Sequence, residues 1–120
     1  KVGKQTDTES PIQFRILRCM QYMIENYKEQ HTIKTLAERF CMHPSYLIHL
    51  FKSEVGITPH RYMLELKIAK AKEFLINFNQ PPVLTAVELG FHDYSHFHRT
   101  FKKIAGLSPQ EFVKRNMPQY

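Results

Sequence analysis

Cysteine, glycine and long apolar runs are all scarce in this chain of 120 residues. Two cysteines are too few for a disulfide framework, and four glycines form no glycine-rich phosphate loop. No window reaches about 18 uncharged apolar residues, and the first ten residues lack the apolar run of a signal peptide. We therefore expect a cytoplasmic protein without a membrane-spanning helix, in which Cys19 and Cys41 are reduced and buried within apolar helical patterns.

Residue patterns that carry catalysis or bind metals are also missing. No nucleophile, base and orienting residue occur together in motif form, and Glu25 and Glu29 are typical of a solvated helix face. His92, His96 and His98 cluster, but two of them need opposite sides of a helix, and a zinc site needs four convergent ligands. We therefore predict no enzyme activity, no metal and no cofactor.

Positive charge is what the chain does have. The chain has 17 lysines and arginines and 11 acidic residues, which gives a net charge of +6 when the seven histidines are counted as neutral. A field of that sign favours polyanions such as nucleic acid or anionic lipid. With 42% apolar residues and nine phenylalanines, the chain is long enough to fold around a buried core.

The spacing of apolar residues predicts an all-α fold of about seven helices, because no segment alternates strictly enough to be a strand. Capping residues, prolines at first helical positions and terminal glycines set the expected boundaries. The helices are expected to begin after Ser10 with Gln13 completing a capping box, after Thr32, at Pro44, at Thr58, near Leu84, after Asp93 and after Ser108. The first helix should bury a stripe that includes Ile16, Met23 and Ile24.

These elements predict two helix-turn-helix subdomains joined by a long central helix. The expected divisions are a flexible linker or tag remnant at 1–10, a first subdomain at 11–57, a linker helix at 58–78, a second subdomain at 79–116 and a tail at 117–120. Lys67, Lys70 and Lys72 should mark the wet side of the linker helix, and either Ala69 or Ala71 its buried side. That helix would be about 30 Å long, close to the roughly 34 Å between successive major-groove faces of a duplex.

An internal repeat supports the two subdomains. A shift of fifty residues lays FKSEVGITP at residues 51–59 over FKKIAGLSP at residues 101–109. Upstream, a shift of 49 aligns Ala37 with Ala86 and Cys41 with Gly90. A small residue four positions before the turn lets the second helix cross the first closely, as a helix-turn-helix unit requires.

The outer face of each second helix has groove-binding chemistry. Ser45, Ile48, His49 and Lys52 share one side of the first unit's second helix, and their equivalents are Ser95, His98, Arg99 and Lys102. An arginine can donate two parallel hydrogen bonds to guanine, whereas an isoleucine can only contact a thymine methyl group. We expect phosphate contacts from Lys52, Lys102 and Lys103, while Tyr46 either packs at the helix start or contacts phosphate.

Both units resemble the DNA-binding domain of the AraC/XylS family of bacterial transcription regulators, over nearly the whole span from Ile12 to Arg115. LAERFCMHPSYLIHLFKSEVGITP resembles the family's first helix-turn-helix unit, and AVELGFHDYSHFHRTFKKIAGLSPQEF resembles its second. The resemblance implies that each unit places its second helix in the major groove of promoter DNA. It also implies an activator that contacts RNA polymerase, with a sensor or dimerisation domain possible upstream.

The resemblance carries over to individual positions. It assigns base contacts to Ser45, Ile48 and His49 in the first unit and to Tyr94, Ser95, His98 and Arg99 in the second, and His96 joins the expected phosphate contacts. The sequence departs from the family pattern at Cys41, where glycine is usual, and at His43, where a capping serine is usual. Pro82 and Thr85 also replace usually apolar residues.

Three other functions compete with DNA binding as interpretations of the sequence. A duplicated helical hairpin can act as a scaffold or protein-interaction module without DNA binding, which is the main alternative. Membrane attachment through a basic amphipathic helix is disfavoured, because the apolar side of the central helix is needed for the core. RNA binding is disfavoured because the sequence has no aromatic-rich sheet and no GXXG clamp.

Overall fold

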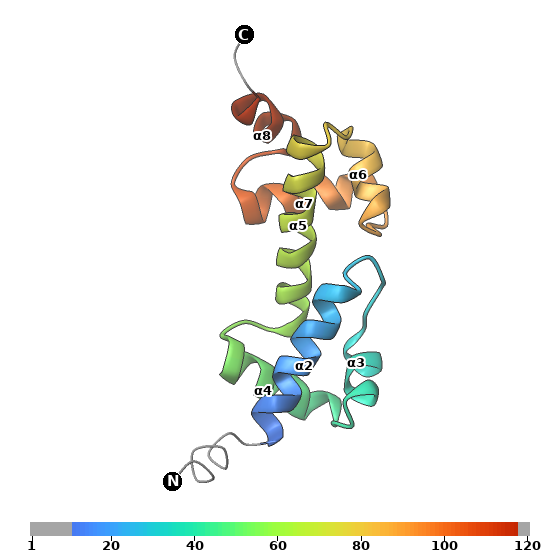
Figure 1. Cartoon of the computed structure of the whole chain (residues 1–120), viewed down its shortest axis with the longest axis vertical. Coiled ribbons are helices and arrows are strands. Elements are labelled where there is room, and N and C mark those ends of the chain that lie inside the picture. Colours follow the sequence, from blue (N-terminus) through green and yellow to red (C-terminus); the bar gives the residue numbers. More distant parts are fainter. Residues whose placement is uncertain (1–10, 118–120) are drawn as a thin grey trace. The chain divides into compact units, whose positions relative to one another are not determined.

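The computed structural model describes residues 11–117, with side chains described from Phe14 onward. The described residues form seven α-helices and no strand, which confirms the all-α prediction (Figure 1). The helices are α2 (Pro11–Glu25), α3 (Ile33–Arg39), α4 (Pro44–Val55), α5 (Pro59–Asn77), α6 (Pro82–Glu88), α7 (Tyr94–Ala105) and α8 (Pro109–Asn116). The cap predicted from Ser10 and Gln13 lies outside the described part of the chain.

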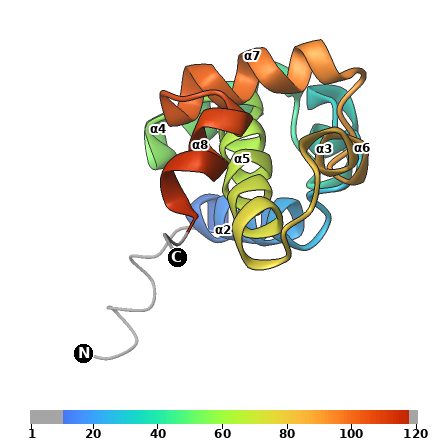
Figure 2. The same cartoon turned by 90° about the horizontal axis from the view of Figure 1, so that it is seen from above.

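The helices fall into two compact units. Within the described residues, the first unit contains the chain up to Asn26 and His31–Tyr62, and here α2 and α3 pack on α4. The second unit contains Tyr27–Gln30 and the chain from Met63 onward, and here α6 and α8 pack on α7 (Figure 2). The long helix α5 passes from the first unit to the second after Tyr62. The subdomain boundaries expected from the sequence stay a prediction.

Helix ends follow the local signals in the sequence. The Thr32 hydroxyl accepts a hydrogen bond from the Thr35 backbone N–H at 3.1 Å and caps α3. Ser108 and Glu111 form the expected capping box of α8, with reciprocal bonds of 3.1 and 2.9 Å. Such bonds satisfy backbone donors that have no partner within the helix, which is why these residue types mark helix starts. The helix α6 begins at Pro82, slightly before the expected start near Leu84.

The core of the first unit lies between α2, α3 and α4. It is formed by Ile16, Cys19, Met23, Leu36, Ala37, Met42, Leu47 and Phe51. The Phe51 ring packs against Tyr62, with ring centroids 5.5 Å apart. One expected core residue is wrong, because Ile24 is 45% exposed and lies on the outer side of α2 with Phe14 and Leu17. The buried stripe of α2 instead contains Cys19, four residues before Met23.

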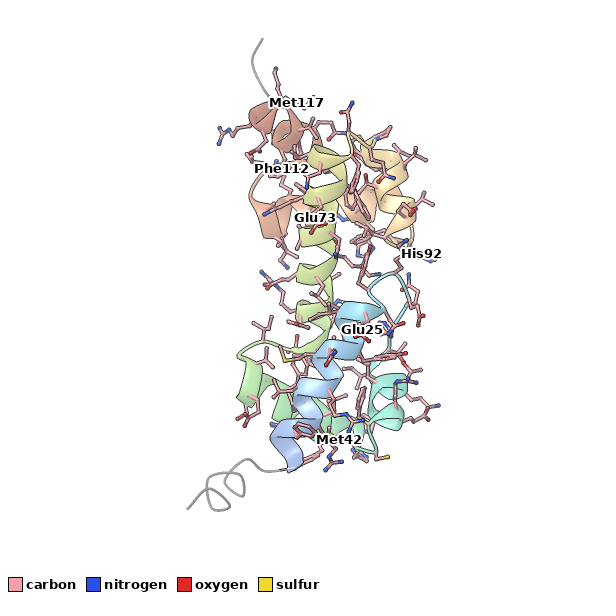
Figure 3. The ribbon with its side chains drawn as sticks, viewed as in Figure 1. Glu25, Met42, Glu73, His92, Phe112 and Met117 are labelled. Atoms are coloured by element: carbon pink, nitrogen blue, oxygen red, sulfur yellow. The ribbon has the colours of Figure 1, made fainter. Side chains whose placement is uncertain are left out.

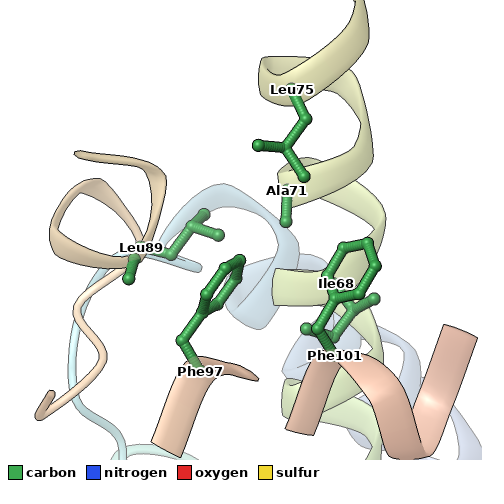
Figure 4. Packing of buried hydrophobic residues seen from close by; sticks show 7 residues of the cluster. Ile68, Ala71, Leu75, Leu89, Phe97 and Phe101 are labelled. Atoms are coloured by element: carbon green, nitrogen blue, oxygen red, sulfur yellow. The ribbon is translucent and has the colours of Figure 1, made fainter. Parts of the chain in front are cut away.

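The core of the second unit is built around two phenylalanines of α7. Phe97 and Phe101 point toward Ile68 and Ala71 of α5, and Leu89 at the end of α6 closes the cluster (Figure 4). The rings of Phe97 and Phe101 are 5.7 Å apart, a separation typical of favourable aromatic pairs. Burying each ring contributes roughly 1.5–3 kcal/mol to the stability of the fold. These two side chains therefore anchor the apolar face of α7, which lies opposite its polar face.

The structure of the central helix α5 corrects one prediction about its faces and decides between two alternatives in another. Lys67, expected on the wet side, is only 5% exposed, and the buried alanine is Ala71 rather than Ala69. Residues four apart share a helix face, so Lys67 lies on the same stripe as Ala71 and Leu75. Its ammonium nitrogen lies 5.4 Å from the centre of the Phe91 ring, a cation–π contact, and burial lowers the pKa of Lys67.

Removing a core ring should cost far more than removing an exposed one. Phe97→Ala is expected to lower the free energy of unfolding by about 3–5 kcal/mol, because it leaves a cavity between α5 and α7. Phe78→Ala is the control in the same unit, since Phe78 is 69% exposed, and it should change stability by less than about 1 kcal/mol. Urea unfolding followed by circular dichroism measures both, and equal losses would contradict this packing.

Candidate nucleic-acid interface

The two helix-turn-helix units have the same hydrogen-bonded turn. In the first unit, the backbone N–H of Met42 donates to the Ala37 carbonyl at 2.8 Å. In the second, the N–H of Phe91 donates to the Ala86 carbonyl at 3.0 Å, at the equivalent positions of the repeat. Ala37 and Ala86 are both almost fully buried, as the close helix crossing requires. The internal repeat of the sequence is therefore also a repeat of the backbone.

Each turn contains one residue in the left-handed region. Cys41 has a φ of 57° and Gly90 a φ of 80°, a backbone conformation that glycine adopts most readily. The expectation of a buried Cys41 thiol is wrong, because the residue is exposed in this turn. Cys19 is buried as expected, and burial raises the pKa of its thiol to about 11.

Side-chain caps fix where each second helix begins. Nδ1 of His43 accepts a hydrogen bond from the Ser45 backbone N–H at 3.2 Å, so this histidine caps the start of α4. The Asp93 carboxylate accepts from the His96 N–H at 2.7 Å at the start of α7. Both helices end at a left-handed glycine, Gly56 and Gly106, as the sequence predicts. The two candidate recognition helices, α4 and α7, thus have matching starts and ends.

The predicted outer face of α4 is exposed. Ser45, His49 and Lys52 are exposed, and Ile48 is 38% exposed. Tyr46, in the first turn of the helix, is 42% exposed. Leu47 and Phe51, on the opposite side, are fully buried and hold the helix by its inner face. The structure brings these outer residues together on one helix, and what they contact stays a prediction.

The outer face of α7 combines exposed cations with half-buried rings. Ser95, Arg99, Lys102 and Lys103 are exposed, and His98 is half-buried. No acidic residue occurs within α7, so its face has positive charge only. Lys102 and Lys103 also lie in the last turn, where cations interact favourably with the helix dipole.

Two of the predicted contact residues on α7 are partly held by the core. Tyr94 packs against the Phe97 ring at 5.9 Å, and its hydroxyl accepts a hydrogen bond from the Gln110 amide. The His96 ring lies edge-on against Phe91, with centroids 5.3 Å apart. Both rings are therefore oriented before any ligand arrives, and a DNA contact from either stays a prediction.

Neither a metal site nor a membrane span is present in the described part of the chain. No three His, Cys, Asp or Glu side chains among residues 14–117 come together in an arrangement that could hold a metal ion. His92 lies in the turn ahead of α7 (Figure 3), while His96 packs on Phe91. Among the described helices, none has the length and apolarity needed to cross a membrane.

Sequence reasoning missed two groups that support the turns. Arg15 of α2 donates hydrogen bonds to backbone carbonyls in the first turn, and Gln30 donates to a backbone carbonyl in the second. Arg15 is half-buried and Gln30 exposed, and neither belongs to a motif. No pattern in one sequence could have found them, because each partner is at least 25 residues away along the chain.

Each unit consists of a helix, a turn with a left-handed residue and a capped second helix with a polar outer face. Two such units define a double helix-turn-helix domain. A family model described as a helix-turn-helix domain matches residues 36–115. The chain belongs to this family, and within it to the AraC/XylS type that the sequence resembles.

Similar proteins include regulators of sugar operons. The arabinose operon regulatory protein of Salmonella typhimurium is 33% identical over 103 residues, which are 85% of this chain and 37% of the regulator. The melibiose operon regulatory protein of Escherichia coli is 28% identical over 102 residues, 85% of this chain and 34% of that protein. The chain thus spans little more than a third of the length of these curated relatives.

Solved structures with the same fold support the assignment. The C-terminal domain of AraT, a response regulator from Geobacillus stearothermophilus, aligns with a TM-score of 0.83 and 28% identity, covering 92% of this chain and 89% of that one. The DNA-binding domain of AdpA in complex with a target DNA aligns with a TM-score of 0.79 over 83% of this chain and 90% of that one. At 21% identity, the likeness to AdpA shows the fold alone.

The two cysteines should differ sharply in reactivity. A thiol-specific alkylating reagent is expected to label Cys41 in the folded domain, because that residue is exposed, and to leave Cys19 unlabelled, because burial raises its pKa. Mass spectrometry before and after addition of denaturant counts the labels on each residue. Equal labelling of both cysteines in the folded domain would show that Cys19 is not buried.

Proposed function

We propose that this domain binds double-stranded promoter DNA sequence-specifically, with α4 and α7 each inserted in a major groove. The observation that carries the proposal is the repeated turn that leaves a capped second helix exposed on its polar side and buried on its apolar side. A major groove admits one α-helix, and side chains along that helix meet base edges. The positive face of α7 and the net charge of +6 favour the phosphate backbone in addition.

Within this proposal, each predicted residue has a role. Base contacts come from Ser45, Ile48, His49, Tyr94, Ser95, His98 and Arg99, and phosphate contacts from Tyr46, Lys52, His96, Lys102 and Lys103. Arg99 should contribute most to sequence specificity, because it is exposed and its guanidinium can donate hydrogen bonds to guanine O6 and N7 at the same time. Ile48, in contrast, offers only an apolar surface suited to a thymine methyl group.

The length of α5 supports joint binding by both units. A continuous helix of 19 residues is about 28 Å long, which is near the roughly 34 Å between successive major grooves on one side of a duplex. A helical connection also restricts the freedom of the second unit after the first has bound, which raises its effective concentration at the DNA. We therefore propose that the two recognition helices enter successive major grooves.

The wider role follows from resemblance and is part of the proposal. The family that the sequence resembles consists of bacterial regulators, usually activators that contact RNA polymerase. We extend that role to the full-length protein, together with a cytoplasmic location and a sensor or dimerisation domain elsewhere in the protein. The greater length of the relatives supports a further domain, because this chain matches about a third of each.

Binding should depend steeply on salt. If about six phosphates are neutralised, the logarithm of the association constant should fall with the logarithm of salt concentration at a slope near −5. Fluorescence anisotropy with a labelled duplex, titrated between low and physiological salt, measures the slope. A flat response, or a domain that retains no duplex from sheared genomic DNA, would instead favour a protein-interaction module.

Replacing Arg99 and replacing Lys102 should change DNA binding in different ways. Arg99→Ala is expected to lose about 1–3 kcal/mol of discrimination at one base position, because the paired donors to guanine are gone. Lys102→Ala should weaken binding to all duplexes by a similar factor, because a phosphate contact has no sequence information. Selection of bound sites from a randomised duplex library compares the two variants. An unchanged base preference in the Arg99 variant would reject the role of this residue.

A further inference from the structure

In both turns, the residue with a positive φ has a backbone carbonyl that accepts a hydrogen bond. The donor in each case is a side chain from outside the repeat. Nη1 of Arg15 donates to the Cys41 carbonyl oxygen at 3.1 Å and to the Phe40 carbonyl oxygen at 3.3 Å. Nε2 of Gln30 donates to the Gly90 carbonyl oxygen. Cys41 and Gly90 are equivalent in the repeat and have matching positive φ angles. Two chemically different side chains therefore make the same kind of contact in the two units.

The first contact comes from the helix that packs behind α4. Arg15 is half-buried on α2, one residue before the buried Ile16. Its guanidinium is planar and its donors are held in a fixed geometry, so that one nitrogen can join two successive carbonyls of the turn. A charged donor also makes a stronger hydrogen bond than a neutral one. Arg15 thus ties the end of α3 to α2.

The second contact comes from a four-residue segment, Tyr27–Gln30, that belongs to the second unit although its neighbours in sequence belong to the first. Tyr27 packs against the buried cluster around Phe97. Its ring also lies 5.3 Å from the ammonium of Lys70. These contacts anchor the start of the segment in the second unit.

The rest of the segment lies directly on the second turn. The ammonium of Lys28 pairs with the Glu88 carboxylate at 3.7 Å. A Cβ atom added to Gly90 would lie 2.7 Å from the Lys28 carbonyl oxygen, closer than such atoms approach one another. Gly90 therefore has two reasons to be glycine, its positive φ and the close approach of this segment.

The carbonyl at such a turn has a mechanical role. The left-handed residue ends the first helix and sets the direction in which the chain enters the second. Because the carbonyl oxygen of that residue has no partner in the helix that it ends, a side-chain donor can hold the peptide plane in one orientation. Holding that plane restricts the angle between the two helices of the unit.

We propose that Arg15 and Gln30 are positioning residues, one for each recognition helix. Arg15 holds the turn ahead of α4, and Gln30 holds the turn ahead of α7. Each residue affects DNA affinity through the recognition helix that follows its turn, and it does not contact DNA itself. The proposal rests on the proposed function, because a fixed helix angle matters only if the helix must fit a groove.

The first experiment measures the turns without DNA. Arg15→Ala should speed hydrogen exchange of the Met42 amide by at least about fivefold and leave the Phe91 amide unchanged, since one hydrogen bond contributes about 1 kcal/mol and Arg15 makes two. Gln30→Ala should do the reverse. Arg18→Ala and Gln21→Ala are the matched controls, because both are exposed on α2 and make contacts within α2. Exchange measured by NMR that speeds up in both turns alike, or in neither, would overturn the proposal.

A pair of glycine variants tests the covering segment separately. Gly90→Ala and Gly106→Ala introduce the same strain, because φ is 80° and 87°, but an added Cβ meets nothing within 4 Å at Gly106. Gly90→Ala should therefore lower the urea midpoint of unfolding more than Gly106→Ala does, because only Gly90→Ala adds a collision to the backbone strain. Equal effects would show that the segment does not hold the turn. If Gly90→Ala prevents folding, the Gln30 variant still decides the question.

The second experiment asks whether the effect reaches DNA through α7. Gln30→Ala should weaken binding to a selected duplex severalfold, and this loss should shrink in an Arg99→Ala background, because both changes then affect the same contact. A merely structural loss would be the same in both backgrounds, and that outcome would overturn the positioning role.

The two proposals fail in different ways. If the unaltered domain binds no duplex, the proposed function is wrong and the positioning role falls with it, whatever the exchange rates. If the unaltered domain binds duplex but the exchange rates do not separate the two turns, the positioning role alone is overturned.

Discussion

The left-handed turn between the two helices of each unit is the constraint on which the interface depends. A polar helix face is available to a ligand only if the apolar face of that helix is held against a core at a fixed angle. The turn provides the angle through its backbone bond to Ala37 or Ala86, and these alanines are small enough for the second helix to approach. Leu47 and Phe97 then bury the inner faces. The exposed side chains of α4 and α7 follow from that arrangement.

Helix boundaries could be predicted because their causes are local. Thr32, Asp93 and Ser108 each bond a backbone N–H three residues later, so a short stretch of sequence contains the whole interaction. Burial was predicted less well because it depends on distant partners. Lys67 was expected in water, but its alkyl stem lies on a buried stripe and its ammonium meets Phe91, 24 positions further along the chain. The sequence predicts a buried Cys41, but this residue is exposed in the turn.

The candidate site shows the same division between local and distant causes. Helical periodicity was enough to predict that Ser45, His49 and Arg99 lie on outer faces, because the buried stripe of each helix determines the opposite side. Periodicity could not predict that Tyr94 is half-buried and bonded to Gln110, since that contact depends on where α8 packs. The donors Arg15 and Gln30 were beyond sequence reasoning for the same reason, being 26 and 60 residues from Cys41 and Gly90.

The two turns also show why a duplicated fold diverges at some positions and not at others. Both require a positive φ, which any residue other than glycine adopts at a cost of roughly 1–2 kcal/mol. At Cys41 the side chain is exposed, so the backbone strain is the whole cost and a cysteine is tolerated. At Gly90 a side chain would also collide with the Lys28 carbonyl, because Tyr27–Gln30 covers that turn. The difference between the two copies therefore originates outside both repeats, in the segment Tyr27–Gln30 that lies against the second turn.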